Sequence, residues 1–592
     1  MTKILGINAY HADASASLVV DGKVVVAIEE ERLCRIKHWA GFPKLAIKTC
    51  LESQNLTISD IDHIAINSSP KANLIKKYQY TILKRPDINF ILEKLEKKLQ
   101  RMNIQEEIVQ LFPKNTIKAK FHFINHHLAH LASAFYGSPF NSATVVSVDG
   151  FGDFSSTAIG YGNSNKIKIK KQVFFPHSLG IFYTALTQYL GFPKYGDEYK
   201  IMGLAPYGKP KYIDEMREIV KIYKDGSFKL NLKYFTHTSS GAPHKWDGGE
   251  PLIKDLFSNK IIELLGPQRI KNTTLLDKHK DLANSIQAMY EEAFFNIINS
   301  YAPYDSSDNL CIAGGCGANS VANGKITSKT KFNKVYIHPA PGDAGGALGA
   351  ALEVWHKIKK VRCAPMQTAY LGPKISNDFI NNFFKKPETL RLLSKSNSKL
   401  LKLGDSILSN EENLLDLIAE AISQGKVIGW FEGEMEWGPR ALGHRSILGD
   451  PRKANMKDIL NLKIKRRESF RPFAPAILKE KVSDWFDINS EYDLDVPFMM
   501  KVYSIHPEKR KLIPAVCHID GSGRLQTVTG KDNGRYYRLI KKFFNKTGVP
   551  IILNTSFNEN EPIVYSIKEA LDCYLRTKMD YLVIENHIIF RV

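Results

Sequence analysis

The chain contains 592 residues, 43% of them hydrophobic, and its formal net charge is +21. This composition excludes a disordered or collagen-like polymer and predicts at least two domains with large cores. The charge favours anionic partners, which include nucleotides, phosphate esters, nucleic acid and acidic lipid surfaces, although most of it is expected on solvated faces.

The N-terminus and the cysteines indicate the compartment. The first residues contain no basic region followed by a long apolar stretch, and no run of ~18 apolar residues, the length of a membrane span, occurs anywhere. The seven cysteines are odd in number and form no Cys-x-x-Cys pair, which argues against a disulfide framework and a Cys-ligated zinc. We therefore expect reduced thiols in a soluble cytoplasmic protein that has no membrane partner.

The first predicted elements form a pattern that occurs twice. Residues 3–8 are expected to form a buried strand, followed by a polar loop that contains His11 and Asp13 and then by a hairpin. Residues 143–148 form a second apolar strand, followed by an acidic loop over 149–153 and two more strands. The actin-like and sugar-kinase fold begins each of its halves with such a unit, and the acidic loops face a nucleotide. Two ordinary β-meanders with acidic turns are the alternative.

Two histidines lie on a predicted helix just before the second of these units. If Asn125 caps the helix, His126 and His130 share one face, at the spacing that lets two imidazoles reach one metal ion. Asp149, at the end of the adjacent strand, and Asp343, in a later glycine turn, are the natural candidates to complete such a site. Two histidines and two aspartates suit Fe(II), Mn(II) or Zn(II). A structural pair of histidines is the alternative.

Two glycine-rich turns follow. Gly314 and Gly315 come after a predicted strand and precede Asn319, and Asp343 stands at the start of a predicted helix of small residues. Glycines let the backbone approach a phosphate, and the N-terminus of a helix presents free N–H groups to it. We therefore expect nucleotide contacts at Gly314, Gly315 and Asn319. For the glycines inside the helix, close packing against a neighbour is the alternative.

The chain is expected to divide into two domains. Residues 361–410 lose hydrophobic periodicity and are rich in Lys, Asn and Ser, which predicts a linker or loosely packed connector. A helix followed by the strand 426–431 opens the next domain near Glu411. We therefore predict α/β domains over 1–360 and 411–592.

The C-terminal domain contains many arginines and lysines among glycine, proline and aromatic residues. Such surroundings do not suit a solvated helix face, and the planar guanidinium of arginine matches phosphate oxygens two at a time. The composition therefore predicts a pocket for a small anion, which short rigid turns favour, with a nucleic-acid surface as the alternative. The residues of this predicted pocket are Arg440, Arg445, Lys463, Lys465, Arg466, Arg467, Arg471, Arg524 and Ser556.

Many motifs occur in one order along nearly the whole chain. They are EEERLCRIKH, HHLAHLASAF, SVDGFGD, SLGIFYTALTQYLGF, DEYKIMGLAPYG, GDAGGALGAAL, GPRALGHRSIL, FRPFAP, RLQTV and LNTSFN. In these motifs the chain resembles the O-carbamoyltransferases of the NodU/CmcH family. The resemblance implies an actin-like (ASKHA, Kae-type) N-terminal domain, similar to the enzymes that make threonylcarbamoyl-adenosine in tRNA, and a YrdC-like C-terminal domain.

The resemblance also implies a reaction in two stages. Carbamoyl phosphate and ATP, the latter with Mg²⁺, would form carbamoyl adenylate in the C-terminal domain. The carbamoyl group would then pass to a hydroxyl of a small-molecule natural product or sugar in the N-terminal domain. No nucleic acid would take part, and a homodimer stays open. The alternatives are a tRNA-modifying threonylcarbamoyl-type transferase and a non-catalytic actin-like regulatory ATPase.

Site residues follow from the resemblance, motif by motif. The implied metal ligands are His126, His130, Asp149 and Asp343, with iron preferred to manganese or zinc. The implied contacts to carbamoyl phosphate and its adenylate are Lys37, Arg440, Lys465, Arg471, Arg524 and Ser556. Arg440 would act in adenylate formation, and His11 or Asp13 would take the proton of the acceptor hydroxyl.

Overall fold

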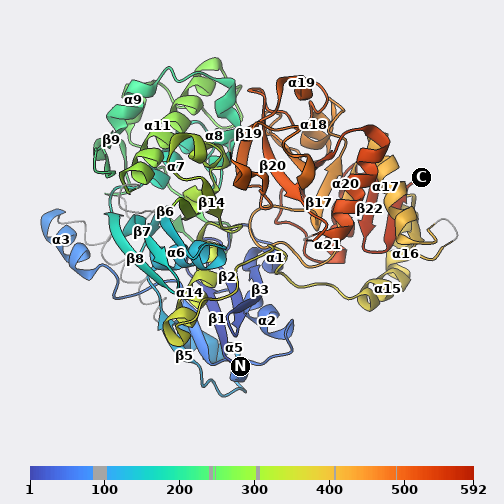
Figure 1. The fold of residues 1–592 in the computed structure, drawn as a ribbon, viewed down its shortest axis with the longest axis horizontal. Coiled ribbons are helices and arrows are strands. Elements are labelled where there is room, and N and C mark those ends of the chain that lie inside the picture. The colour runs from blue at the N-terminus through green and yellow to red at the C-terminus, as the bar shows by residue number, and fades with distance from the viewer. Residues whose placement is uncertain are drawn as a thin grey trace. The chain divides into compact units, whose positions relative to one another are not determined.

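The computed structural model divides the chain into two compact units, Met1–Met366 (unit 1) and Gln367–Val592 (unit 2) (Figure 1). The structure describes residues 1–84, 103–238, 244–246, 248–301, 307–405, 408–488, 490–531 and 533–592. Among these residues, no helix combines the length and the apolar character that crossing a bilayer requires. All seven cysteines are free thiols.

The first sheet of unit 1 has five strands in the order β3-β2-β1-β4-β5. They are β1 (Lys3–Asn8), β2 (Ser15–Val20), β3 (Lys23–Glu29), β4 (His63–Ile66) and β5 (Lys120–Phe123). β1, β2 and β3 form an antiparallel meander, whereas β4 is parallel to β1 and β5 is parallel to β4. The buried strand and hairpin expected at the N-terminus are therefore present.

The second sheet of unit 1 repeats this plan. Its strands are β6 (Ser142–Gly152), β7 (Ser155–Asn163), β8 (Lys166–Phe174), β13 (Asn309–Ala313) and β14 (Lys334–Ile337). Their order is β14-β13-β6-β7-β8, with an antiparallel meander from β6 to β8 and parallel pairing of β13 with β6 and β14. Strand order and direction thus match those of the first sheet. This duplication confirms the actin-like and sugar-kinase plan that the sequence predicts.

Two helices of unit 1 pack against each other, α6 (His126–Gly137) and α14 (Asp343–Lys359). A Cβ on Gly349 of α14 would lie 1.8 Å from the carbonyl oxygen of Ala129 in α6, so only glycine permits this approach. Close packing, the alternative considered for these helix glycines, therefore accounts for Gly349. Among the described residues of unit 1, the other helices of at least five residues are α1 (Glu30–Cys34), α2 (Lys44–Glu52), α3 (Leu74–Lys84), α5 (Ile104–Leu111), α7 (Leu179–Tyr189), α8 (Glu198–Leu204), α9 (Ile213–Ile219), α10 (Asn259–Leu265) and α11 (Asp277–Tyr301).

Unit 2 is built on one mixed sheet of nine strands, in the order β15-β23-β22-β16-β17-β21-β18-β20-β19. The strands are β15 (Ser398–Lys402), β16 (Ile428–Phe431), β17 (Arg445–Gly449), β18 (Ala474–Leu478), β19 (Lys501–Ser504), β20 (Ser522–Val528), β21 (Ile551–Ser556), β22 (Tyr581–Ile584) and β23 (His587–Arg591). Its longer helices are α15 (Asn377–Lys385), α16 (Pro387–Lys395), α17 (Glu411–Ser423), α20 (Gly534–Thr547) and α21 (Ile567–Arg576). The likeness of this unit to the YrdC fold stays a prediction.

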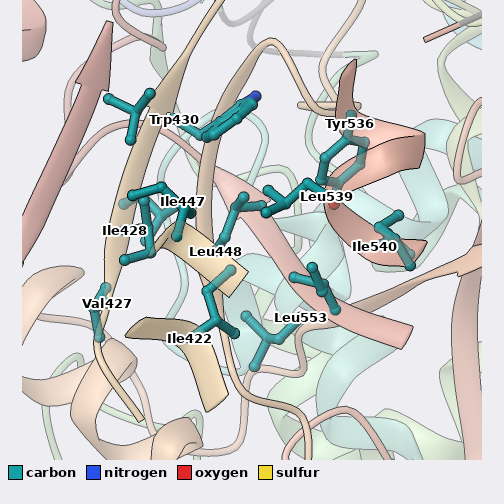
Figure 2. Packing of buried hydrophobic residues seen from close by; sticks show 14 of the residues in the cluster. Ile422, Val427, Ile428, Trp430, Ile447, Leu448, Tyr536, Leu539, Ile540 and Leu553 are labelled. Carbon is teal, nitrogen blue, oxygen red and sulfur yellow. The ribbon is translucent and has the colours of Figure 1, made fainter. Parts of the chain in front are cut away.

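The core of unit 2 contains side chains from the sheet and from the helices (Figure 2). Trp430 of β16 and Tyr536 of α20 are fully buried in this cluster. Leu448 of β17 and Leu553 of β21 belong to the same cluster, so strands and helix share one apolar interior. Burial of this kind is the main source of stability for the sheet that carries the C-terminal motifs.

The segment expected as a connector, 361–410, contains folded elements of unit 2. α15 and α16 bury Ile380 and Phe384, among others, in the core of unit 2, and β15 pairs with β23 along its whole length. The compact unit therefore begins at Gln367. Ile380 and Phe384 have helical spacing, but α15 and α16 contain only nine residues each, so the period is not sustained long enough to mark a domain in the sequence.

Candidate metal centre and anion pocket

Two imidazoles from α6 form one side of a buried cluster in unit 1. The side chain of Asn125 accepts a hydrogen bond from the Leu128 N–H (3.1 Å), which caps α6 at its start. His126 and His130 follow one turn apart on the helix, and both are fully buried. Their Nε2 atoms lie 3.0 Å apart.

Asp149 and Asp343 complete this cluster. Asp149 lies in β6, and its Oδ2 is 3.1 Å from Nε2 of His126 and 3.2 Å from Nε2 of His130. Asp343 begins α14, and its Oδ1 is 3.4 Å from each of the same two nitrogens. The structure therefore brings all four predicted metal ligands together, with their ligand atoms within 4.8 Å of one another.

The electrostatics of the cluster favour a positive charge at its centre. Burial disfavours the charged imidazole, but the hydrogen bond with Asp149 and the charges of Asp149 and Asp343 raise the pKa of His126 to about 10. Burial likewise opposes ionisation of Asp149, yet the two histidines hold the pKa of its carboxyl well below its usual range. Oδ1 of Asp343 is buried and has no hydrogen-bond partner among the described residues. A divalent cation fits these donors, since two imidazole nitrogens and two carboxylates suit Fe(II), Mn(II) or Zn(II).

The motif SVDGFGD shapes this centre beyond Asp149. A Cβ on Gly152 would lie 1.9 Å from the ring of His126, so a larger residue would displace that imidazole. Asp153 accepts hydrogen bonds from the backbone N–H groups of His126 and Ser69, each at 2.9 Å. Asp153 therefore fixes the first turn of α6. It was not among the predicted site residues, although its acidic side chain stands in the same motif.

The glycine turn predicted to contact a nucleotide supports Asp149. The N–H of Gly315 donates to Oδ1 of Asp149 (3.0 Å), and Gly314 has a φ of 87°, a conformation that favours glycine. The side-chain oxygen of Asn319 caps the short helix that follows, and its amide exchanges hydrogen bonds with Gln287 at 3.0 and 3.1 Å. Nucleotide contacts at these three predicted residues stay a prediction.

The polar loop after β1 carries Asp13 into an ion pair with a residue outside the predicted set. Oδ1 of Asp13 lies 2.7 Å from Nδ1 of His38, whose backbone N–H donates to Glu31 (2.9 Å). Burial opposes the charged form of His38, but the neighbouring carboxylates of Asp13 and Glu31 raise its pKa to about 9. His11 approaches the metal cluster instead, with its ring centroid 4.9 Å from that of His126.

The motif RIKH forms a sharp turn after α1. Arg35 and His38 both have left-handed backbones, with φ of 63° and 54°. Lys37 lies inside this turn, next to His38. The contact of Lys37 with carbamoyl phosphate or its adenylate stays a prediction. The histidine of the same motif was the signal that would have pointed to the partner of Asp13.

Four guanidinium groups gather in unit 2. Burial, together with the charges of Arg440, Arg467 and Arg471, holds the pKa of the Arg524 guanidinium well below its usual range. Nε of Arg524 is buried and has no hydrogen-bond partner among the described residues. Because neighbouring positive charges repel one another, such a cluster favours a bound anion. Three of the residues predicted for the carbamoyl phosphate pocket are therefore neighbours, and Arg467 joins them.

Lys465 and Ser556 also come together. Lys465 is only 1% exposed, and its Nζ donates to Oγ of Ser556 (3.2 Å) and to the backbone and side-chain oxygens of Asn558 (2.8 and 2.6 Å). The ammonium group thereby fixes the turn that contains the end of the LNTSFN motif. These two residues support the turn through hydrogen bonds within the chain.

Three other basic residues of the predicted pocket have different surroundings. The guanidinium of Arg445 is fully buried, donates to backbone carbonyl oxygens and lies 3.6 Å from the centroid of the Phe431 ring. Arg466 is exposed and pairs with Glu559 at 3.1 Å, and Lys463 is exposed as well. Arg445 therefore has a structural role, because both of its terminal nitrogens donate to the backbone just after β16.

Solved structures show low-scoring likenesses to this chain. Component A of (R)-2-hydroxyglutaryl-CoA dehydratase from Acidaminococcus fermentans is 12% identical, with a TM-score of 0.33 over 60% of this chain and 99% of that chain. HypF from T. kodakarensis is also 12% identical, with a TM-score of 0.31 over 61% of this chain and 48% of that chain. The fold assignment therefore rests on the duplicated strand order.

Curated relatives match over much longer stretches. The uncharacterised protein sll1178 from Synechocystis sp. is 37% identical over 626 residues, which span 100% of this chain and 97% of the relative. The nodulation protein NolNO from Sinorhizobium fredii is 34% identical over 588 residues, 98% of this chain and 79% of the relative. The nodulation protein NolO from Bradyrhizobium diazoefficiens is 36% identical over 468 residues, 78% of each protein.

Two family models match the two halves of the sequence. The model of the carbamoyltransferase N-terminus matches residues 3–352, and the model of the carbamoyltransferase C-terminus matches residues 419–591. The first match covers unit 1 with its histidine–aspartate cluster, and the second covers most of unit 2 with its arginine cluster. The chain therefore belongs to the carbamoyltransferase family of enzymes.

Proposed function

We propose that this carbamoyltransferase activates carbamoyl phosphate with ATP and then transfers the carbamoyl group to a hydroxyl of a small-molecule natural product or sugar. Water would attack the phosphorus of carbamoyl phosphate, so that its bond to the bridging oxygen breaks, phosphate leaves and carbamate keeps both oxygens. A carbamate oxygen would then attack the α-phosphorus of ATP, supplied with Mg²⁺, releasing pyrophosphate. In the second step the acceptor oxygen would attack the carbamoyl carbon of carbamoyl adenylate. AMP would then leave, and the hydroxyl proton would pass to a base of the protein.

The observation that carries this proposal is the arginine cluster of unit 2. Carbamoyl phosphate is small and doubly anionic, and the approach of carbamate to ATP brings two anions together. Guanidinium groups offset that repulsion by pairing with phosphate oxygens. We assign this task to Arg440, Arg471 and Arg524, with Arg467 among them. Lys465 would hold the turn at Ser556 in place beside the phosphates.

The histidine–aspartate cluster of unit 1 supports the second step. His126, His130, Asp149 and Asp343 would hold a divalent ion, for which we propose iron, with manganese or zinc as alternatives. When bound, the ion supplies positive charge for the phosphate of the adenylate. The residues present fit such an ion, because Oδ1 of Asp343 is buried without a hydrogen-bond partner among the described residues.

The base of the second step would come from the loop after β1. Asp13 is the better candidate, because His38 holds its carboxylate at 2.7 Å and so fixes the direction of its free oxygen. His11, next to the ring of His126, is the other candidate. Lys37, which precedes His38 in the same turn, keeps its proposed role as a contact to carbamoyl phosphate or its adenylate.

Step-resolved assays of three variants test the division of labour. Release of pyrophosphate from ATP, dependent on carbamoyl phosphate, reports the first step, and carbamoylation of hydroxylated metabolites by labelled carbamoyl phosphate reports the second. We expect Arg440→Ala to abolish pyrophosphate release. His130→Ala should keep that release and lose transfer. Arg466→Ala is the matched control, because this nearby arginine is exposed and paired with Glu559, and it should behave as wild type.

Other outcomes would exclude the scheme. If His130→Ala stops pyrophosphate release as completely as Arg440→Ala does, the two sites do not divide the reaction. If carbamoyl phosphate stimulates no pyrophosphate release from ATP in the wild type, a regulatory ATPase becomes the better description. Tight, salt-sensitive binding of tRNA would favour the threonylcarbamoyl-type alternative.

A further inference from the structure

A pair of histidines lies on the first sheet of unit 1, and the proposed reaction uses neither of them. His63 begins β4, and His122 lies in β5, the strand at the edge of the sheet. The register pairs His63 with Lys120 and Ala65 with His122, so both imidazoles leave the same face of the sheet. Nδ1 of His63 lies 3.1 Å from Nε2 of His122.

We propose that His63 and His122 form a second metal site, which binds a divalent transition-metal ion of the Ni(II), Cu(II) or Zn(II) type. Imidazole nitrogen is a good ligand for these ions. With bonds of ~2.0–2.1 Å, a nitrogen separation of 3.1 Å corresponds to an N–metal–N angle of ~100°. That angle lies between the right angle of octahedral or square-planar coordination and the tetrahedral angle. Both nitrogens therefore reach one ion with little movement of either strand.

The protons of the pair also suit this role. Without an ion, the short contact is a hydrogen bond, in which a ring N–H donates to a ring nitrogen that carries no proton. Binding would move the shared proton to the far nitrogen of the donor ring and leave both facing lone pairs for the ion. The number of protons on the pair stays the same, so the two neutral imidazoles release no proton to solvent when the ion binds.

The charges around the pair influence its affinity for a metal ion. Asp62 precedes His63 in the chain, while Lys120 in β5 and Lys357 and Lys359 at the end of α14 also act on the pair. The lysines disfavour a cation, but both histidines are only half-buried, so solvent and salt screen much of this repulsion. The remaining coordination positions would be taken by water. We therefore expect weaker binding here than at the four-ligand cluster.

Titration with Ni(II) tests the site. Calorimetry on the full-length chain without an affinity tag would compare the wild type with His63→Gln, His122→Gln and the double variant. The four-ligand cluster is the same in all of them, so the difference isolates the pair. We expect each single substitution to weaken one class of Ni(II) site by at least ~10-fold and the double variant to lose no more, because a chelate needs both rings.

The control is His506→Gln. It removes another half-buried histidine, and it should leave the titration unchanged. Nε2 of His506 lies 3.1 Å from the backbone oxygen of Ser483. Single variants that titrate like the wild type would overturn the proposal, and so would losses that add up in the double variant, which two independent ligands would give. Carbamoyl transfer by all these variants should equal that of the wild type, so failure here leaves the proposed function standing.

Discussion

Arginines in neighbouring motifs serve different tasks according to what surrounds their guanidinium groups. Arg445 is fully buried, both of its terminal nitrogens donate to backbone oxygens, and its guanidinium lies over the Phe431 ring. Arg524 is instead crowded by three other arginines, while the buried Nε of each of the two residues has no hydrogen-bond partner among the described residues. Both arginines have glycines close by in the sequence, so composition predicted one pocket for both. Only their places in β17 and β20, which decide what surrounds each guanidinium, separate the structural arginine from those proposed to bind an anion.

The pair of Asp13 and His38 makes a prediction about transfer. His38→Ala should lower the rate of carbamoyl transfer by ~10-fold or more, since Asp13 loses the partner that orients its carboxylate. Pyrophosphate release should stay unchanged. Added imidazole should restore part of the transfer rate, which a purely structural defect would not allow. A parallel loss of both steps would show that His38 serves the fold instead.

The same pair makes a prediction about pH and stability. The neighbouring carboxylates raise the pKa of His38 from its ordinary 6.5 to about 9, even though burial opposes this. A raised pKa in the folded state means that the pair contributes its full stability below pH 6.5 and loses it as the pH rises through about 9. The difference in Tm between the wild type and His38→Gln should therefore shrink over that range. A difference that grows with pH would contradict the ion pair.

At the scale of elements, the centre of unit 1 depends on how closely α6 and α14 approach. The cap at Asn125 and the spacing of His126 and His130 were predictable, because a helical period places residues four apart on one face. The contribution of Asp343 was predictable as a candidate from its glycine turn. The support from Asp153 was not, because it depends on how the loop after Asp149 folds back onto the start of α6.

Gly349→Ala tests this dependence. The new methyl group would meet the carbonyl oxygen of Ala129, so the two helices must separate. We expect a loss of ~1–3 kcal/mol in the free energy of unfolding, as for other overpacked cores. Metal content should fall as well, since α6 carries two of the proposed ligands and α14 carries one. Gly534→Ala, a helix position with no atom within 4 Å of the new Cβ, should cause neither effect.

At the scale of the whole molecule, the duplicated sheets of unit 1 and the nine-stranded sheet of unit 2 are two separate frameworks, one for each step of the proposed reaction. The duplication was visible in the sequence because each meander has its own turn residues. The start of unit 2 was not visible, because α15 and α16 are short and mostly exposed, and β15 finds its partner β23 almost at the other end of the sequence. Pairing over such a distance leaves no local signal.

Truncation checks where unit 2 begins. A fragment over 367–592 should unfold cooperatively, whereas one over 411–592 should not. The shorter fragment lacks β15 and the buried side chains of Ile380, Phe384 and Leu393. At ~1.5–3 kcal/mol for each large apolar side chain, their loss is comparable with the whole stability of an ordinary domain. Denaturant unfolding, followed by circular dichroism, would measure the cooperativity of each fragment. Equal cooperativity of both fragments would show that residues 361–410 are a connector after all.

The fate of the carbamoyl oxygens tests the two-step reaction most directly. Carbamoyl phosphate would be labelled with oxygen-18 at its carbonyl oxygen and at the oxygen that bridges carbon and phosphorus. It would be supplied with ATP and an acceptor that the enzyme carbamoylates, and mass spectrometry would measure the mass of the AMP. A carbamate oxygen that attacks the α-phosphorus stays with AMP when the acceptor displaces it, so each AMP should carry one oxygen-18 atom. Carbamoylated product accompanied by unlabelled AMP, or by no AMP at all, would contradict an adenylate between the two sites.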